Sequence, residues 1–319
     1  MSQSPTETAA PQASPLLTHR QRWRILLVGG SALCVALVLW LGRWLGLPVH
    51  ADYEASLLQQ PNVVAAVLVA GLALLLSVVL GTLIAAPIRF DGGLLIGVVG
   101  LAGLSLRGGT MRDVILWSGR LPGTTPCPQI FGLLMLETLL LFALVGGVWL
   151  IIWHLYQRGL LRGRVQPYSD LPKVSAARTA AAIGLQTAVA AVVTLLVGQS
   201  EQKAQAMAAA GIGAFFGAGA AEFYFRNARI ARWYWVGPAA VALLGYALAW
   251  INPAGLATAD LHGWTASLAR PLPLDYASIG AAGALLGHWS GAPVVKAISD
   301  LVNEGLAMIT GGQRPGAKR

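Results

Sequence analysis

The sequence contains very little charge for its length. Asp, Glu, Lys and Arg make up 11% of the 319 residues, whereas soluble domains carry roughly a quarter. A water-facing surface needs charged side chains, so this chain has little such surface to cover. The composition therefore excludes an ordinary soluble domain, and the mean hydropathy of +0.64 points the same way.

Cysteine and metal-ligand patterns are also scarce. Cys34 lies inside an apolar run and Cys127 lies in a loop, so a structural disulfide is not expected. No CxxC occurs and the five histidines are scattered, whereas zinc sites place their ligands at short, regular spacings. The sequence predicts neither a metal site nor a cofactor.

Signatures of common enzymes are missing as well. The chain has no GxxxxGK[ST], HExxH or GxSxG, the patterns of phosphate-binding loops, metalloproteases and serine hydrolases. Gly211, Gly213 and Gly217 form GxGxxxG, whose spacing does not suit a dinucleotide fingerprint. No catalytic residue is predicted, although membrane enzymes can assemble sites from distant helices.

Long apolar runs are what the sequence has instead. About 20 apolar residues cross a ~30 Å hydrocarbon layer as a helix, and β-barrels show shorter alternating segments. We therefore predict an all-α, polytopic transmembrane helix bundle of about eight spans. Seven is the alternative, because 92–106 is short and 277–294 is interrupted by polar residues. The eight ranges are 25–46, 63–86, 92–106, 130–153, 179–198, 206–225, 235–251 and 277–294.

The distribution of basic residues predicts the topology. With eight crossings and a cytoplasmic N-terminus, and with Arg43 left out because it lies at a helix end, sixteen basic residues fall inside and five outside, the bias expected of cytoplasmic loops. The net charge of +9 is then explained by topology and by anionic lipid headgroups, and no nucleic acid is expected. We predict a multi-pass protein of a cytoplasmic (inner) membrane, and the composition rich in Ala, Leu and Gly suits a bacterial one.

Three regions are expected along the chain. Residues 1–19 are typical of a disordered cytoplasmic tail, and 20–294 form the bundle. Residues 295–319 contain an amphipathic helix, expected on the inner interface or against the bundle, and a basic tail. A cleaved signal peptide is the alternative for the first run, but 25–47 is longer than the apolar region of a usual signal peptide and contains Arg43 near its end.

Glu137 is the most unusual residue, because it lies in an otherwise apolar run. It lies about seven residues, or ~10 Å, inside its span, where an unpaired charge costs on the order of a few kcal/mol. We expect it to be protonated, or paired with Arg107 or Arg43 from the ends of neighbouring spans. The rival hypothesis is a proton or cation site with Gln186 and His288 as distant members.

Two other charged features have both a structural and a functional interpretation. Glu222 and Arg226 are four residues apart and are expected to pair at the membrane interface. The long loop after 92–106 contains Arg107, Arg112 and Arg120, which suit an anionic ligand or a partner. Alternatively, Asp113 and nearby carbonyl groups satisfy these arginines locally.

Glycines recur at four-residue spacing in three spans. In lipid, helices associate by close backbone approach, which glycine permits. We expect tight packing within the chain, with a contact to another subunit as the alternative, above all through the last set. The sets are Gly93 and Gly97; Gly213 and Gly217; and Gly283, Gly287 and Gly291.

These patterns favour one class of function and leave two others open. Few polar groups lie within the spans, so a non-catalytic structural or assembly component that binds partners in the lipid bilayer is expected, as a homo- or hetero-oligomer. The alternative is a transporter or channel for a small solute with Glu137 in its polar lining. A membrane-embedded enzyme is the third class.

Overall fold

The computed structural model describes seven stretches of the chain. They are 19–47, 56–85, 91–118, 128–160, 174–225, 233–252 and 264–291. The predicted tail at 1–19 (except for His19), the amphipathic helix at 295–319, Arg120 and Arg226 lie outside these residues.

The described residues form helices and contain no strand. Five helices are long and apolar enough to cross a membrane, so the predicted all-α membrane bundle is confirmed, while the number of crossings stays a prediction. The long helices are α1 (His19–Trp44), α2 (Val63–Ala85), α5 (Gln129–Gln157), α6 (Ala176–Val197) and α7 (Lys203–Phe225). Two shorter apolar helices are α3 (Gly92–Ser105) and α8 (Val236–Ile251).

The last span is broken near its beginning. The short helix α9 (Trp264–Ala269) is followed by residues 270–272 without helical structure. Helical structure resumes in α10 (Pro273–Asp275), passes through a π-helical turn, η4 (Tyr276–Gly280), and continues over 281–291. The sequence places this helix at 277–294 and misses both the break and α9.

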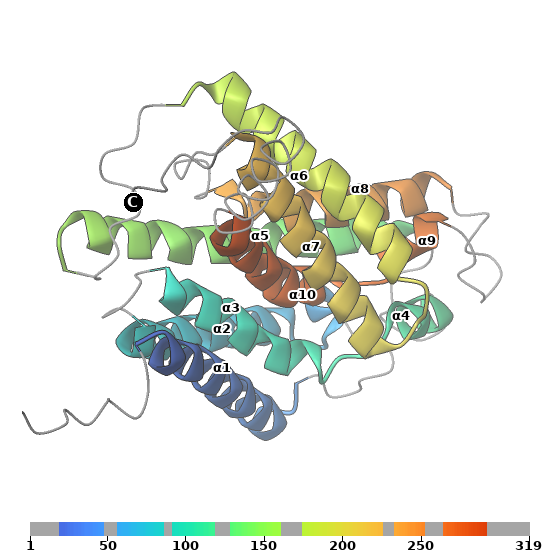
Figure 1. The fold of residues 1–319 in the computed structure, drawn as a ribbon. Helices are drawn as coiled ribbons and strands as arrows, with labels where there is room; N and C mark the ends of the chain where they lie inside the picture. Colours follow the sequence, from blue (N-terminus) through green and yellow to red (C-terminus); the bar gives the residue numbers. More distant parts are fainter. Residues whose placement is uncertain are drawn as a thin grey trace, which may run out of the picture.

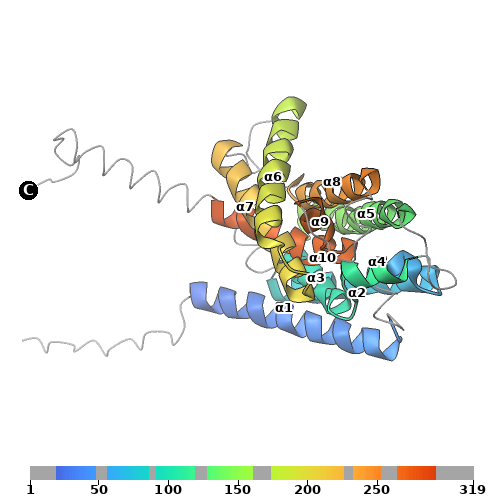
Figure 2. The ribbon, with the colours of Figure 1, turned by 90° about the vertical axis from the view of Figure 1, so that its right-hand side faces the viewer.

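The helices form two groups around the last span. Figures 1 and 2 show α1, α2 and α3 on one side and α6 and α7 on the other, with the helix labelled α10 between them. The apolar helices alternate in direction along the chain when the shorter α3 and α8 are counted with the long ones, so the bundle has two ends. The near end is where α1 begins and α5 ends, and the far end is where α1 ends and α5 begins. The short helices α4 (Met111–Trp117) and α9 lie at the far end, on the right of Figure 1.

Glycines allow neighbouring helices of the bundle to pack closely against each other. A methyl group at Gly93 or Gly97 of α3 would overlap Thr82 or Val78 of α2. Nearly all of α3 is buried, which explains how a 14-residue helix, only about 21 Å long, is accommodated: lipid does not surround it.

The other two glycine sets are also used within the chain. Gly213 and Gly217 of α7 face α6, where a methyl group would overlap Thr194 or the Gln186 carbonyl. Gly283 and Gly287 face the backbone of α7, and Gly291 faces Glu222. The subunit contact considered for the last set would therefore have to use another surface.

Candidate functional site

A buried carboxylate with a lysine partner lies at the far end, at Asp275. This residue lies in the first turn of the helix that starts at Pro273, and its carboxylate accepts a hydrogen bond from the Leu272 N–H at 2.8 Å. Proline suits the first helical position, and an acid suits the first turn because of the helix dipole. The local sequence therefore explains why the buried carboxylate turns back towards the break.

Two other helices supply the remaining partners of Asp275. The Lys203 ammonium, at the start of α7, lies 2.8 Å from Oδ1 and 3.1 Å from Oδ2. The Ser105 hydroxyl, at the end of α3, donates to Oδ1. Asp275 is fully buried, while the Lys203 side chain is 17% exposed. One carboxylate thus joins α3, α7 and the last span.

Glu137 lies in the same end of the bundle but has different partners. It is 1% exposed, and its Oε2 accepts hydrogen bonds from the Ser56 hydroxyl and from the Leu58 N–H at 3.3 Å. These donors belong to the turn η1 (Leu57–Gln59), just before α2. The turn covers the carboxylate, so Glu137 links α5 to the α2 entrance through uncharged donors.

The expected pairing of Glu137 with Arg107 or Arg43 is therefore corrected. The Arg107 Nε instead donates to the Leu47 carbonyl at 2.7 Å, and Arg43 is exposed at the end of α1. Both arginines are at the predicted end, but Arg107 uses a backbone carbonyl in the turn that follows α1 instead of the carboxylate.

A pair of alanine variants tests this correction. Arg107→Ala is expected to lower the free energy of unfolding by about 1 to 2 kcal/mol, because it removes a charge-assisted hydrogen bond between the turns that follow α3 and α1. Arg43→Ala is expected to change it by less than about 0.5 kcal/mol, as exposed substitutions do. Thermal unfolding in mild detergent measures both, and a larger loss for Arg43→Ala would restore the original pairing.

Three buried side chains at the break at 270–272 donate hydrogen bonds to backbone carbonyl groups. The Tyr246 hydroxyl donates to the Pro271 carbonyl at 2.5 Å, and the Tyr276 hydroxyl donates to the Leu268 carbonyl at 2.8 Å. The Arg270 guanidinium donates to the Gly198 carbonyl at 2.6 Å. Non-helical backbone inside a membrane protein needs such internal partners, so the tyrosines and Arg270 make the break possible.

Sequence reasoning did not identify Asp275 or Lys203. The available signal was the stretch Arg270–Asp275, in which Pro271 and Pro273 flank one residue and an acid follows two residues later. Two prolines so close together interrupt a helix, and the acid then fits the first turn of the next. Lys203 gave no comparable signal, because lysine at the end of a span is ordinary.

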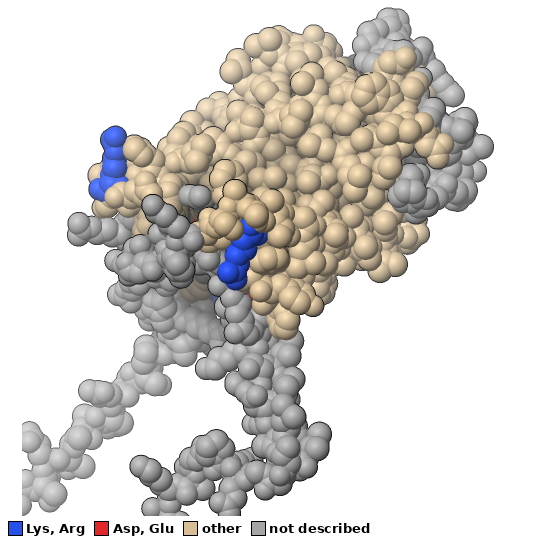
Figure 3. All heavy atoms as spheres, turned by 90° about the horizontal axis from the view of Figure 1, so that it is seen from above, with Lys and Arg blue, Asp and Glu red and all other residues tan. Residues whose placement is uncertain are grey.

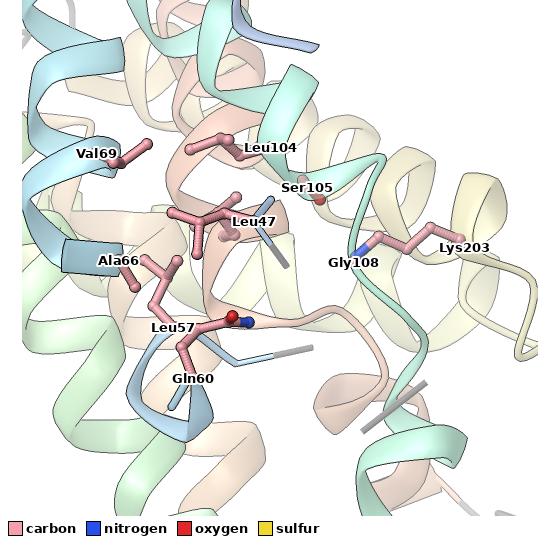
Figure 4. A pocket seen from close by; sticks show the side chains of 10 residues that line it. Leu47, Leu57, Gln60, Ala66, Val69, Leu104, Ser105, Gly108 and Lys203 are labelled. Atoms are coloured by element: carbon pink, nitrogen blue, oxygen red, sulfur yellow. The ribbon is translucent and has the colours of Figure 1, made fainter. Parts of the chain in front are cut away.

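The space beside this cluster is narrow. Figure 4 shows Leu47, Ala66, Val69 and Leu104 directed into it, with Ser105 and Lys203 at one side. Its free volume is about 20 Å³, and a single water needs roughly 10 to 15 Å³. The pocket therefore has room for about one water, too little for an organic solute.

The described residues include no group of three His, Cys, Asp or Glu side chains placed to hold a metal ion. Comparison of the whole chain with protein families, with curated proteins and with solved structures found no match. The chemistry of the site must therefore be inferred from its own geometry.

A second polar cluster lies nearer the other end and contains the remaining predicted residues. Glu222 is 7% exposed, accepts a hydrogen bond from the Tyr234 hydroxyl at 3.1 Å and lies 3.0 Å from the His288 Nδ1. The Gln186 side chain donates to the Tyr234 carbonyl at 2.6 Å. Glu222 is thus buried between helices, and its predicted place at the membrane interface stays a prediction. Gln186 and His288 belong to its cluster and not to that of Glu137.

The basic loop is only partly described. Asp113 caps α4 by accepting hydrogen bonds from the Thr110 N–H at 2.8 Å and from its hydroxyl at 2.7 Å. Arg112 lies 3.4 Å from Glu201 across an exposed contact. Asp113 therefore caps α4 and does not pair with the arginines. Arg107 instead donates to the Leu47 carbonyl, and Arg112 contacts Glu201, which is distant in the sequence.

Proposed function

We propose that the protein is a non-catalytic, multi-pass membrane component that acts by binding partners, in a structural or assembly role. The observation that carries this proposal is that the buried acids at the far end are occupied by contacts within the protein. Asp275 and Glu137 bond to residues from other parts of the bundle, and the space beside them has room for about one water. Such contacts stabilise the bundle, and the space beside them among the described residues is too small for an organic solute.

The exterior of the bundle supports the same proposal. The face seen in Figure 3 carries almost no charge among the described residues. On α2, Leu68, Leu72, Val79 and Leu83 are each about half exposed or more. Side chains of this kind suit lipid tails and the apolar helices of a partner equally, and a partner-binding component needs both.

Gentle detergent extraction tests the partner role. We expect the 33.3 kDa chain to elute in a larger particle with a second protein at a fixed ratio. Leu68→Trp and Leu72→Trp, on the exposed face of α2, are expected to change that ratio, with Gly147→Trp on α5 as the matched control. A lone monomer recovered from its native membrane would contradict the proposal.

A transporter remains the second candidate because of the break at 270–272. Discontinuous helices build substrate and ion sites in several transporter folds, and here the break adjoins the Asp275–Lys203 pair. Reconstituted vesicles test this function by pH-driven or ion-driven flux. Flux lost in Glu137→Gln but kept in Glu222→Gln would favour transport over the partner role.

We also propose a cytoplasmic membrane with the N-terminus inside. The support is the ratio of sixteen inner to five outer basic residues under this topology. With Cys34 and Cys127 replaced by serine in both variants, a membrane-impermeant thiol reagent added to intact cells should label Arg112→Cys at the far end and leave Arg178→Cys at the near end unlabelled. The reverse pattern would invert the topology.

A further inference from the structure

A second hollow lies on the exterior of the bundle and opens between α6, α7 and the helix over 281–291. Its volume is about 410 Å³, and its larger lining residues include Val189, Val193, Phe216, Phe223 and Tyr224. Gly219, Ala220, Gly287 and Gly291 also line it, and their small size leaves the space between the rings. Phe215 and Ser290 complete the eleven lining residues, and the hollow that they form is called the outer groove.

The dimensions and chemistry of the outer groove suit a hydrocarbon chain. Along α7 it extends from Phe215 to Tyr224, about 14 Å at 1.5 Å per residue, which is close to half of a ~30 Å hydrocarbon layer. Its lining is almost wholly apolar, so a polar solute would find few hydrogen-bond partners there. Phe216 and Tyr224 are 54% and 70% exposed, so their rings stand open towards the surroundings of the bundle.

The near end of the outer groove is positively charged. The Arg178 guanidinium donates to the Phe225 carbonyl at 3.1 Å, one residue beyond Tyr224, and Arg178 is exposed. A guanidinium has five N–H donors, so one bond to a carbonyl leaves others for a ligand. Arg178 lies in the first turn of α6, after its N-cap Ser175, where the helix dipole adds to the attraction for anions.

We propose that the outer groove binds an anionic glycerophospholipid, with one acyl chain along α7 and the phosphate at Arg178. The groove has the length of one leaflet and ends at a cation, which is the layout of such a lipid. The proposal does not depend on the function proposed above, since structural components and transporters both bind lipids.

Lipid titration of the purified protein tests the proposal. Phosphatidylglycerol and phosphatidylcholine with identical chains are added in neutral detergent, and binding is followed by native mass spectrometry and thermal unfolding. We expect phosphatidylglycerol to bind at least tenfold more tightly and to raise the melting temperature. Equal binding of the two lipids would contradict the proposal that the groove selects an anionic headgroup.

Paired variants separate the chain site from the headgroup site. Ala220→Trp fills the groove and Arg178→Gln removes the cation, and each should weaken phosphatidylglycerol binding at least tenfold. The matched controls are Gly147→Trp, on the open surface of α5, and Arg24→Gln, at another exposed arginine of the near end; each should change binding less than twofold. Should Ala220→Trp fail to fold, Val193→Trp takes its place, and unchanged binding in either groove variant would overturn the proposal.

Discussion

Replacing Asp275 with alanine is expected to lower the free energy of unfolding by about 3 kcal/mol or more, because it leaves the Lys203 ammonium without the carboxylate that it pairs with. Removing one partner of a buried ion pair costs roughly 3 to 5 kcal/mol. The lower part of that range applies here, since the Lys203 side chain keeps 17% of its surface in contact with the surroundings. Ser105 and the Leu272 N–H lose their acceptor as well.

The measurement is unfolding in mixed micelles or by heat in mild detergent, with a double-mutant cycle. Asp275→Leu combined with Lys203→Met should recover a large part of the loss, because an apolar pair of similar size avoids the desolvation cost of the charges. Glu201→Gln, at the exposed contact with Arg112, serves as the control and should cost less than about 1 kcal/mol. A double variant no better than Asp275→Ala would show that the pair does not act as a unit.

Alanine at Gly287 is the second substitution expected to have a large effect. A methyl group there would overlap the Phe215 carbonyl oxygen, and one at Gly283 would overlap that of Gly211. These obstacles are backbone atoms of α7, which cannot move without displacing the helix. Overpacking a filled interior costs typically 1 to 3 kcal/mol, so the double variant Gly283→Ala, Gly287→Ala is expected to prevent stable folding.

Gly147 provides the matched control for these glycine variants. It lies in α5, and nothing lies within 4 Å of the position that a methyl group would take. Gly147→Ala should therefore leave stability unchanged or raise it by up to about 1 kcal/mol, the helical preference of alanine over glycine. Equal losses at Gly147 and Gly287 would mean that the contact with α7 is not the cause.

The positions of the helices could be predicted from the sequence with good accuracy. The range 63–86 corresponds to Val63–Ala85, and 92–106 corresponds to Gly92–Ser105. Both succeed because the transfer of apolar residues out of water depends on the local run of side chains and hardly on the rest of the chain. Intramolecular packing of the glycine sets was predicted for a similar reason, since each occurs within a single helix.

The site was predictable only in part. Sequence reasoning identified Glu137 as a buried acid near one end of the bundle, but it selected Arg107 and Arg43 as partners. The structure supplies Ser56 and Leu58 instead, from a turn that the sequence placed in an outer loop. A hydroxyl or an amide in a loop looks the same whether it faces water or a carboxylate.

The sequence by itself therefore determined that this protein is a helical membrane bundle, where its long helices run, and that Glu137 lies within one of them. The tertiary structure alone decided which groups meet: Asp275 with Lys203 and Ser105, Glu222 with His288, and the open groove ending at Arg178. Helix position follows from the local hydrophobicity of the chain. Partners depend on which helices are neighbours and how deeply each turn enters the bundle, and both are set by contacts between residues far apart in the sequence.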